Sequence, residues 1–236
     1  MTVVGVRVSA DGQLLYACSS DPGFGKLTGS AKPAITAFRI ADGTPAGRFE
    51  LPGGGFCNDL TELGDGTILA TDSFKPRIYA VSNGAIRVWL EDTRFEGKGF
   101  NLNGIAAVSG AVYVVRYNTG SLYRITVNPD GSAGEVSEVT LSRTLRSPDG
   151  LSAVSSIELI VVEGGGLHAG ALGSLARIRL DRHAGDVDVI ADGLKVPTTA
   201  ALWNGRAYVV EGQLDTLFDK TAGPPEAFRV RAIPVK

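Results

Sequence analysis

Cysteine is scarce in this sequence: Cys18 and Cys57 are the only two among 236 residues. Two lone cysteines do not make a disulfide framework of the kind that holds small secreted domains together. Both are expected as free buried thiols, because cysteine is among the residue types most often buried. A disulfide between them would need a Cα separation below about 7 Å. The sequence does not give that separation, so this alternative stays open.

Long apolar runs and blocks of like charge are also missing. No segment approaches the roughly 20 apolar residues that span a bilayer, and Met1 to Val4 lacks the basic and long apolar regions of a signal peptide. The 23 basic residues are nearly balanced by 25 acidic ones, which disfavours a nucleic acid or a membrane surface as partner. The sequence therefore predicts a soluble, cytoplasmic chain whose partner is a small-molecule substrate.

Helical periodicity is absent as well, so no long helix is expected. Apolar runs rich in β-branched residues, together with 31 glycines, indicate short strands joined by tight turns. The clearest example is Phe100 to Val127, which predicts three strands in a meander. The pattern is repeated along the chain, with fainter copies at both ends, and the first tight turns of the five repeats fall at Gly12, Gly66, Gly110, Ser156 and Gly205. The spacing of roughly 44 to 54 residues is typical of four-stranded propeller blades.

These repeats predict a single all-β domain over residues 1–236, a β-propeller of four-stranded blades with five blade repeats visible. Trp89 and Trp203 are interpreted as packing residues. The fifth repeat ends with residues 227–235, and nothing after them could form its outer strand. That edge must pair with the first repeat, with a second chain or with solvent. A closed monomer is favoured, with a strand-exchanged dimer as the alternative. Outer strands are expected at 47–51, 85–90, 134–141 and 185–191.

The residues seven or eight positions before each first turn should surround one mouth of the propeller channel, because the innermost strand of a blade begins there. They are Val4, Asn58, Asn103, Asp149 and Thr198. Asn58, Asn103 and Asp149 carry oxygen atoms of the hard kind that Ca²⁺ or Mg²⁺ accepts, which predicts a metal site. The alternative is that these side chains only satisfy backbone groups in turns.

The second strands return to the same mouth and bring Asp72, Arg116, Glu163 and Glu211 to an outer ring. Glu163 and Glu211 share the context Val-Val-Glu-Gly, which favours a structural role, accepting backbone hydrogen bonds, over acid/base catalysis. His168 could act as a general base, although a solvated loop histidine is the favoured interpretation, and His183 is expected at the surface. The predicted substrate-binding residues are Asn58, Arg116, Glu163, Glu211 and Thr198.

Three segments carry a resemblance to a known family: Asn58-Asp59 before an Asp-Gly turn, Phe100 to Gly104, and Ser147 to Leu151. They resemble the SMP-30/gluconolactonase/LRE-like group of six-bladed β-propellers, and the resemblance covers essentially the whole chain. It implies a hydrolase with a divalent cation, usually Ca²⁺, that opens lactones. It also implies that Asn103 and Asp149 are metal ligands and that Asn58 contacts metal or substrate.

One departure from the family pattern concerns the metal. The resemblance implies a ligand Glu in a first blade, and this Glu is missing here, since Val4-Gly5 corresponds to the second blade. Calcium binding is therefore expected to be weak or absent. Three alternatives stay open: a ring closed by five blades, a truncated chain, or rearranged termini.

Two functions follow from the residues and the resemblance. The first is a metal-dependent lactonase in which Asp149 is a ligand and the catalytic carboxylate. The alternative is a non-catalytic propeller that serves as a binding module for a small molecule or a protein.

Overall fold

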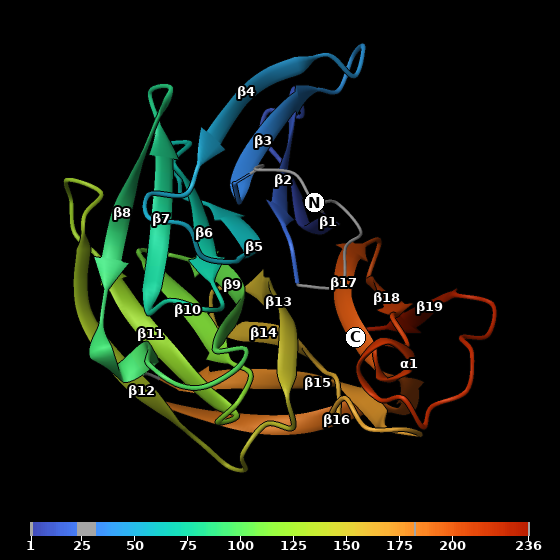
Figure 1. Cartoon of the computed structure of the whole chain (residues 1–236). Helices are drawn as coiled ribbons and strands as arrows, with labels where there is room; N and C mark the ends of the chain where they lie inside the picture. The colour runs from blue at the N-terminus through green and yellow to red at the C-terminus, as the bar shows by residue number, and fades with distance from the viewer. Residues whose placement is uncertain (1, 23–31, 182, 236) are drawn as a thin grey trace. The chain divides into compact units, whose positions relative to one another are not determined.

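The computed structural model describes residues 2–22, 32–181 and 183–235, and nearly all of its regular elements are β-strands (Figure 1). The chain forms two units. The first unit contains Met1–Val112 and Ile125–Glu135, and the second contains Tyr113–Arg124 and Val136–Lys236. The expectation of a single domain over residues 1–236 stays a prediction.

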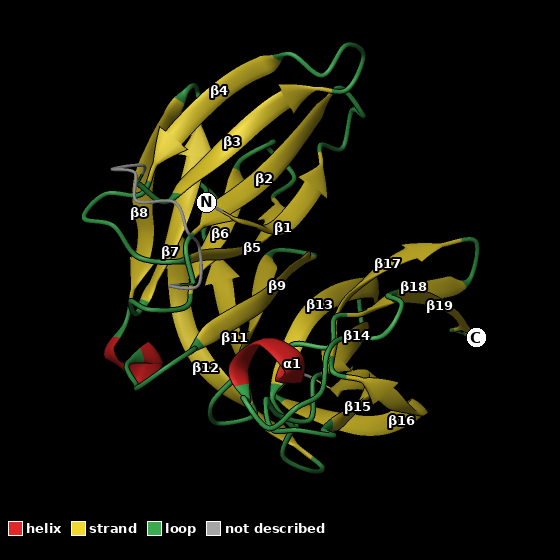
Figure 2. Ribbon diagram, turned by 45° about the vertical axis from the view of Figure 1, so that its right-hand side comes forward, coloured by secondary structure: helices red, strands yellow, loops and turns green. Residues whose placement is uncertain are grey.

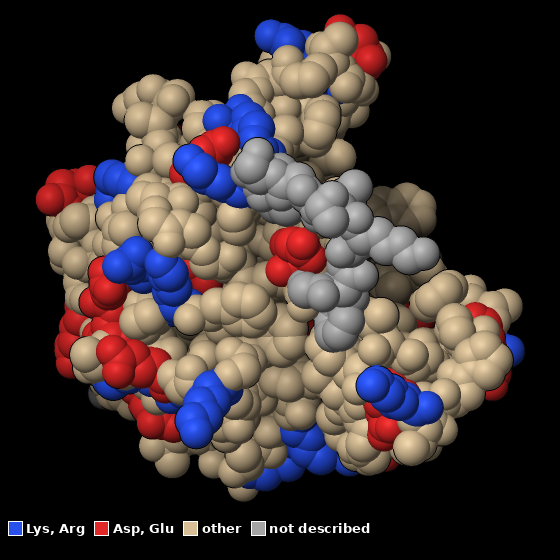
Figure 3. Space-filling model, viewed as in Figure 1, with Lys and Arg blue, Asp and Glu red and all other residues tan. Residues whose placement is uncertain are grey.

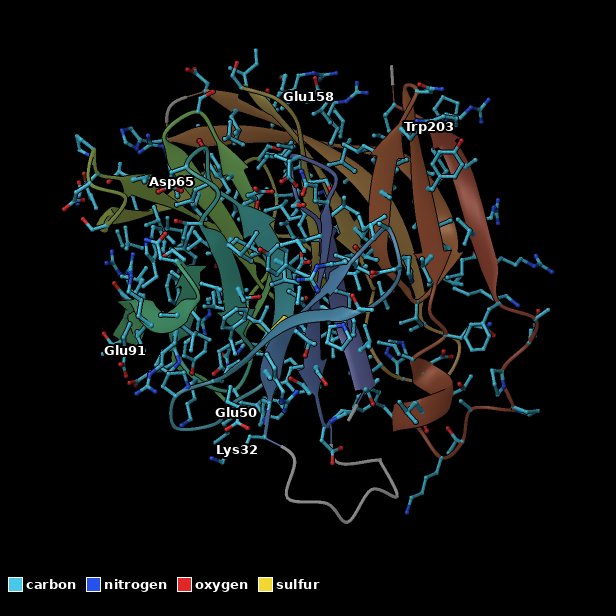
Figure 4. The ribbon with its side chains drawn as sticks, turned by 90° about the horizontal axis from the view of Figure 1, so that it is seen from above. Lys32, Glu50, Asp65, Glu91, Glu158 and Trp203 are labelled. Carbon is cyan, nitrogen blue, oxygen red and sulfur yellow. A yellow bond between two sulfur atoms is a disulfide. The ribbon has the colours of Figure 1, made fainter. Side chains whose placement is uncertain are left out.

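The first sheet of the first unit is an antiparallel meander in the order β1-β2-β3-β4, drawn in blue in Figure 1. Its second strand alternates little and is buried toward its end, whereas β1 exposes Val3, Val6 and Val8. Lys32, which precedes β3, and Glu50, which ends β4, are labelled in Figure 4 and form an ion pair of 3.2 Å. The strands are β1 (Thr2–Val8), β2 (Leu14–Ser20), β3 (Ala34–Arg39) and β4 (Pro45–Glu50).

The second sheet repeats the same order, β5-β6-β7-β8, and Figure 2 shows its strands as neighbouring ribbons. All five residues of β6, Ile-Leu-Ala-Thr-Asp, are buried, and β6 is flanked by β5 and β7. Trp89 on β8 is buried and donates its indole N–H to the carbonyl oxygen of Gly131 at 2.9 Å. The strands are β5 (Cys57–Glu62), β6 (Ile68–Asp72), β7 (Arg77–Ser82) and β8 (Ala85–Glu91).

The two sheets share a core that includes Ile35, Leu60, Ile68 and Tyr79. A disulfide between Cys18 and Cys57 crosses this core, with a Cα separation of 5.2 Å. Both cysteines are fully buried, as expected, but the prediction of free thiols is wrong, because the end of β2 lies beside the start of β5. Disulfides persist mainly in oxidising compartments. This bond therefore weighs against a cytoplasmic location, which stays a prediction.

The third set of strands falls on the boundary between the units. Its members are β9 (Leu102–Val108), β10 (Ala111–Arg116), β11 (Ser121–Val127) and β12 (Ala133–Leu141). They belong to an eight-stranded sheet with the order β13-β14-β15-β16-β12-β11-β10-β9. Within the second unit, β12 and β16 pair in parallel at Thr140 and Leu141.

The remaining strands of the second unit form two antiparallel meanders that share a core including Ile160, Val162, Leu175 and Val209. The last sheet holds three strands, so no fourth strand is present there among the residues described, as the sequence predicted. Trp203 on β17 is 65% exposed (Figure 4), so its interpretation as a packing residue is wrong. The strands are β13 (Pro148–Ser155), β14 (Glu158–Glu163), β15 (Leu172–Asp181), β16 (Ala184–Lys195), β17 (Pro197–Trp203), β18 (Arg206–Glu211) and β19 (Arg229–Pro234).

The tight turns and the lack of long helices agree with the sequence. Four predicted first turns carry glycine in the left-handed region: Gly12, Gly66, Gly110 and Gly205 have φ of 72°, 84°, 77° and 69°. The helices of the described chain are a 3₁₀ turn, η1 (Thr93–Phe95), and one helical turn, α1 (Asp215–Phe218). Neither helix is long or apolar enough to cross a membrane. The all-β prediction of several four-stranded antiparallel sheets is confirmed.

Candidate functional site

The predicted mouth residues occupy one register position in four inner strands. Each is the second residue of its strand: Asn58 in β5, Asn103 in β9, Asp149 in β13 and Thr198 in β17. Inner strands begin where second strands end, since Cys57 pairs with Asp72 and Pro148 with Glu163. The sequence therefore placed these residues at the correct end of their sheets. Asn58 and Asn103 lie in the first unit and Asp149 and Thr198 in the second, and the common channel mouth stays a prediction.

In the first unit, Asn58 is joined to the beginning of β9 through Ser73. The side-chain amide of Asn58 donates to Oγ of Ser73 at 2.8 Å, and this hydroxyl donates to the carbonyl oxygen of Leu102 at 2.5 Å. The amide N–H of Asn101 donates to the carbonyl oxygen of Ser73 at 2.9 Å. Asn58 is 7% exposed and Asn103 is 4% exposed. One serine thus connects the segments that carry the two predicted ligands.

Asn103 holds a buried polar atom with no partner. Its backbone carbonyl accepts a hydrogen bond of 2.7 Å from Thr71 Oγ1, but its side-chain Oδ1 has no hydrogen-bond partner within the described ranges. Leaving a buried acceptor unpaired costs about 1–3 kcal/mol, and most such groups in folded proteins are paired. An amide oxygen in this situation suits a ligand that binds oxygen, such as a hard divalent cation.

Few charged side chains are available as metal ligands. No group of three or more His, Cys, Asp or Glu side chains in residues 2–22, 32–181 and 183–235 is arranged to hold a metal ion. In the first unit the donors at this position are therefore the amide oxygens of Asn58 and Asn103. Neutral oxygen ligands fit Ca²⁺ or Mg²⁺ in kind, but their lack of charge favours weak binding.

Asp59 follows Asn58 and lies in a tight space between inner strands. Its Oδ1 accepts the amide N–H of Leu60 at 2.8 Å and its Oδ2 that of Ile105 at 3.3 Å. Burial raises the pKa of Asp59 to about 6, against the opposing effect of these hydrogen bonds and of Arg7. A Cβ on Gly5 would stand 2.3 Å from the carbonyl oxygen of Asn58, so glycine is needed for β1 to approach β5 this closely.

Asp72, at the end of β6, organises the loops beside Asn58. Its Oδ1 accepts the amide N–H groups of Phe56, Phe74 and Lys75 at 2.8, 2.9 and 3.1 Å. Its Oδ2 accepts the hydroxyl of Tyr79 at 3.1 Å. Burial, with the nearby charge of Asp72, raises the pKa of Tyr79 to about 12. Asp72 is fully buried, so its carboxylate is fixed in a structural role.

Glu163 has the same role in the second unit. Its side chain is fully buried and accepts two hydrogen bonds from the guanidinium group of Arg143, at 2.8 and 2.7 Å. It also accepts hydrogen bonds from the backbone N–H of Arg146 at 2.6 Å and from the hydroxyl of Ser174 at 2.8 Å. Burial alone would raise the pKa of Glu163. The hydrogen bonds from Arg143, Arg146 and Ser174 outweigh it, and the pKa lies below its ordinary value.

Glu211 completes the pattern at the end of β18. Its Oε1 accepts the amide N–H of Lys195 at 3.1 Å and forms an ion pair of 3.7 Å with Arg231. Asp72, Glu163 and Glu211 thus each bind the backbone N–H of the residue one or two positions before the inner strand of their own sheet. This arrangement favours the structural interpretation of Glu163 and Glu211. Substrate binding by them stays a prediction.

Asp149 in the second unit lies near Tyr117. Burial raises the pKa of the Tyr117 hydroxyl, and the charge of Asp149 adds to this effect. Tyr117 follows Arg116, which ends β10 and is 8% exposed. A Cβ on Gly150 would lie 2.6 Å from Thr199 Oγ1, so β13 and β17 approach as β1 and β5 do. The roles predicted for Asp149, Arg116 and Thr198 stay predictions.

Both histidines are exposed, as favoured for His168 and expected for His183. The loop that carries His168 is held through its backbone, since Ala169 N–H donates to Asp219 Oδ2 at 2.8 Å and Gly170 N–H to Asp215 Oδ2 at 3.3 Å. Basic and acidic side chains are interspersed over the face drawn in Figure 3. This distribution fits a small ligand better than a polyanion.

Three features of the site were missed in the sequence: Ser73, Tyr117 and a contact among three phenylalanines. Ser73 directly follows the predicted outer-ring residue Asp72, and Tyr117 directly follows Arg116. Their position one step past the end of a second strand was the available signal. The phenylalanines Phe56, Phe74 and Phe100 flank the same strand ends but are far apart along the chain, so no local pattern connects them.

No protein-family model and no curated protein sequence matches the chain. Solved structures do. A virginiamycin B lyase from Staphylococcus aureus matches with a TM-score of 0.61 and 16% identity over 87% of this chain and 61% of that chain. A gluconolactonase from Xanthomonas campestris matches with a TM-score of 0.60 and 18% identity over 86% of this chain and 67% of that chain. An auxiliary nutrient binding protein from Bacteroides ovatus matches with a TM-score of 0.64 and 14% identity over 98% of this chain and 58% of that chain.

These similarities concern the fold. The matched structures are β-propellers, and the predicted β-propeller class is confirmed. The number of blades in this chain and its membership of the family stay predictions. The chain spans about three fifths of the length of the lyase, 61%, so an activity of the whole protein is a matter for proposal.

Proposed function

We propose that the sheet ends carrying Asn58 and Asn103 bind a small lactone or related ester together with a divalent cation, Ca²⁺ first, and that the chain hydrolyses this substrate. The observation that carries the proposal is the buried Oδ1 of Asn103, which has no hydrogen-bond partner among the described residues. The similarity of fold to a gluconolactonase supports the choice of substrate class.

Each residue has its own proposed role. Asn103 and Asn58 offer amide oxygens, and Ser73 fixes the amide of Asn58 by accepting its N–H at 2.8 Å. A cation held there would polarise the substrate carbonyl and lower the pKa of a bound water. Asp149, in the second unit, enters the proposal from the sequence alone, as a carboxylate expected to bind a metal ion and to accept a proton from water. Burial raises the pKa of Tyr117 above its ordinary value of 10.0, so this hydroxyl near Asp149 carries its proton at neutral pH.

The runner-up is a non-catalytic module that binds a small molecule. It is favoured by the engagement of Asp72 and Glu163 in loop hydrogen bonds and by the lack of a carboxylate cluster in the described chain. The fold similarity to a nutrient binding protein points the same way. In both cases the partner is a small molecule, and a monomer is the proposed state, with a strand-exchanged dimer as the alternative.

Proton release from γ-butyrolactone and from δ-gluconolactone, followed with and without Ca²⁺, separates the two functions. The proposed hydrolase gives turnover that Ca²⁺ stimulates, that a chelator removes and that Asn103→Leu lowers by at least tenfold. Asn118→Leu, in a turn, is the matched control. Lactone binding seen by calorimetry without any turnover would support the binding module and overturn the hydrolase.

A further inference from the structure

Three phenylalanine rings meet at the end of the sheets where Asn58 and Asn103 are placed. The ring centroids of Phe56 and Phe74 are 4.9 Å apart, those of Phe56 and Phe100 5.5 Å, and those of Phe74 and Phe100 5.3 Å. Each ring therefore contacts the other two at distances favourable for aromatic pairs. We call these residues the phenylalanine cluster.

The cluster lies in the layer just outside the predicted ligands. Phe56 stands two residues before Asn58, Phe100 three residues before Asn103, and Phe74 two residues after the end of β6. The backbone joins these segments, since Ser73 N–H donates to the carbonyl oxygen of Phe56 at 2.9 Å and Asn101 N–H to that of Ser73 at 2.9 Å. The residues that hold the amide of Asn58 thus also hold the cluster.

The cluster is rigid but only partly covered. Asp72 Oδ1 accepts the N–H groups of both Phe56 and Phe74, and a Cβ on Gly55, at φ +130°, would stand 1.9 Å from Asp72 Oδ2. Phe56 is 3% exposed, whereas Phe74 is 47% exposed. Phe74 thus offers a partly exposed apolar side chain whose ring contacts two other rings. A ligand can cover such a preorganised surface without ordering the protein first.

We infer that the phenylalanine cluster is a subsite for an apolar substituent of the ligand, so that the preferred substrates are lactones or esters carrying an alkyl or aryl group. This inference rests on the proposed function for the position of the reacting group. Asn58 and Asn103 would then face the polar ester and Phe74 the apolar substituent. Contact of an extra alkyl group with such a surface discriminates between ligands by about tenfold or more.

The test compares γ-butyrolactone with γ-nonalactone, which has the same ring and an alkyl chain. Binding is measured by calorimetry and turnover by proton release, for the wild type, Phe74→Ala, Phe74→Leu and Phe228→Ala. Phe228 is 67% exposed just before β19 and serves as the matched control for loss of a surface phenylalanine. Thermal unfolding of each variant confirms that it is folded.

The inference predicts that Phe74→Ala weakens binding of γ-nonalactone by about tenfold and changes binding of γ-butyrolactone by less than twofold. Phe74→Leu should recover most of the loss, and Phe228→Ala should change neither. Equal effects on both lactones, no effect of Phe74→Ala, or no binding of γ-nonalactone by the wild type would overturn it. Selective binding of γ-nonalactone without turnover would support the subsite and overturn the proposed hydrolysis. Turnover that does not change in Phe74→Ala would support the hydrolysis and overturn the subsite.

Discussion

Asn58 donates its side-chain N–H to Oγ of Ser73 at 2.8 Å. Ser73 in turn donates to the carbonyl oxygen of Leu102, next to Asn103. One hydroxyl therefore sets the orientation of one predicted ligand and the backbone beside the other.

Replacing Ser73 by alanine should weaken both the fold and the site. The change removes two buried hydrogen bonds, and we expect the free energy of unfolding to fall by about 1–3 kcal/mol. Affinity for Ca²⁺ should fall as well, because the amide of Asn58 loses its anchor. Urea unfolding and calorimetry measure the two effects. Ser155→Ala, at an exposed position of β13, should change neither; unchanged Ca²⁺ binding in Ser73→Ala would contradict the role of Ser73.

Glu163→Gln should destabilise the second unit. The glutamine keeps the size of the side chain but leaves Arg143 without its buried counter-charge, at a cost of about 2–3 kcal/mol. Hydrogen bonds hold the pKa of Glu163 below its ordinary value of 4.5. Its stabilising effect is therefore present above pH 4.5 and is lost as the pH falls through the lower, folded pKa. Unfolding curves of both proteins should differ at pH 7 and converge in acid; a difference that does not depend on pH would contradict this.

Removing the disulfide should cost more than any single hydrogen bond. The bond closes a sequence separation of 39 residues, for which the loss of chain entropy in the unfolded state corresponds to about 4 kcal/mol. We expect Cys18→Ala with Cys57→Ala to lose about 2–4 kcal/mol. A reductant should lower the unfolding midpoint of the wild type and leave that of the double variant unchanged. Equal stability of all samples would show that the cysteines do not form the bond in solution.

Asp59 should make the protein less stable as the pH rises. Burial raises its folded pKa to about 6, above its ordinary 3.8, so the folded state holds a proton that the unfolded state releases first. The contribution of Asp59 is full below pH 3.8, declines as the pH rises to about 6 and is then lost. Its size is at most about 3 kcal/mol.

Asp59→Asn keeps the oxygen that accepts from Leu60 and removes the charge. The variant should match the wild type near pH 4 and exceed it in stability at pH 7, as measured by urea unfolding across this range. Asp186→Asn, at an exposed position of β16, is the control and should follow the wild type throughout. If the stability of Asp59→Asn also matched that of the wild type at every pH, the carboxyl of Asp59 would not be protonated in the folded state.

Much of the fold was accessible from the sequence because the signals were local. Glycine at Gly12, Gly66, Gly110 and Gly205 marks turns with positive φ, and the outer strands expected at 85–90 and 134–141 are found as β8 and β12. The Cys18–Cys57 bond and the parallel pairing of β12 with β16 were not accessible. Both join segments about 40 residues apart, and no local sequence pattern predicts that these segments pair.

The site divides in the same way. The register of Asn58 and Asn103 follows from counting back from each turn, and the loop-holding role of Glu163 follows from its repeated context. Ser73 and the phenylalanine cluster were not predicted, because their roles depend on which side chains meet across three segments. The burial of Asp59, which raises its pKa, depends on the approach of β1 and β9 to β5 and has no counterpart in the local sequence.

Calcium titration by calorimetry tests the central claim, that Asn58 and Asn103 hold a divalent cation at the start of β5 and β9. We predict weak binding by the wild type, with Kd on the order of 10⁻⁴ to 10⁻³ M, because both proposed ligands are neutral amide oxygens. Asn58→Leu and Asn103→Leu should each abolish the binding, and Asp65→Asn, in the turn between β5 and β6, should leave it unchanged. Tight binding that survives in both variants would contradict the claim and place the cation elsewhere.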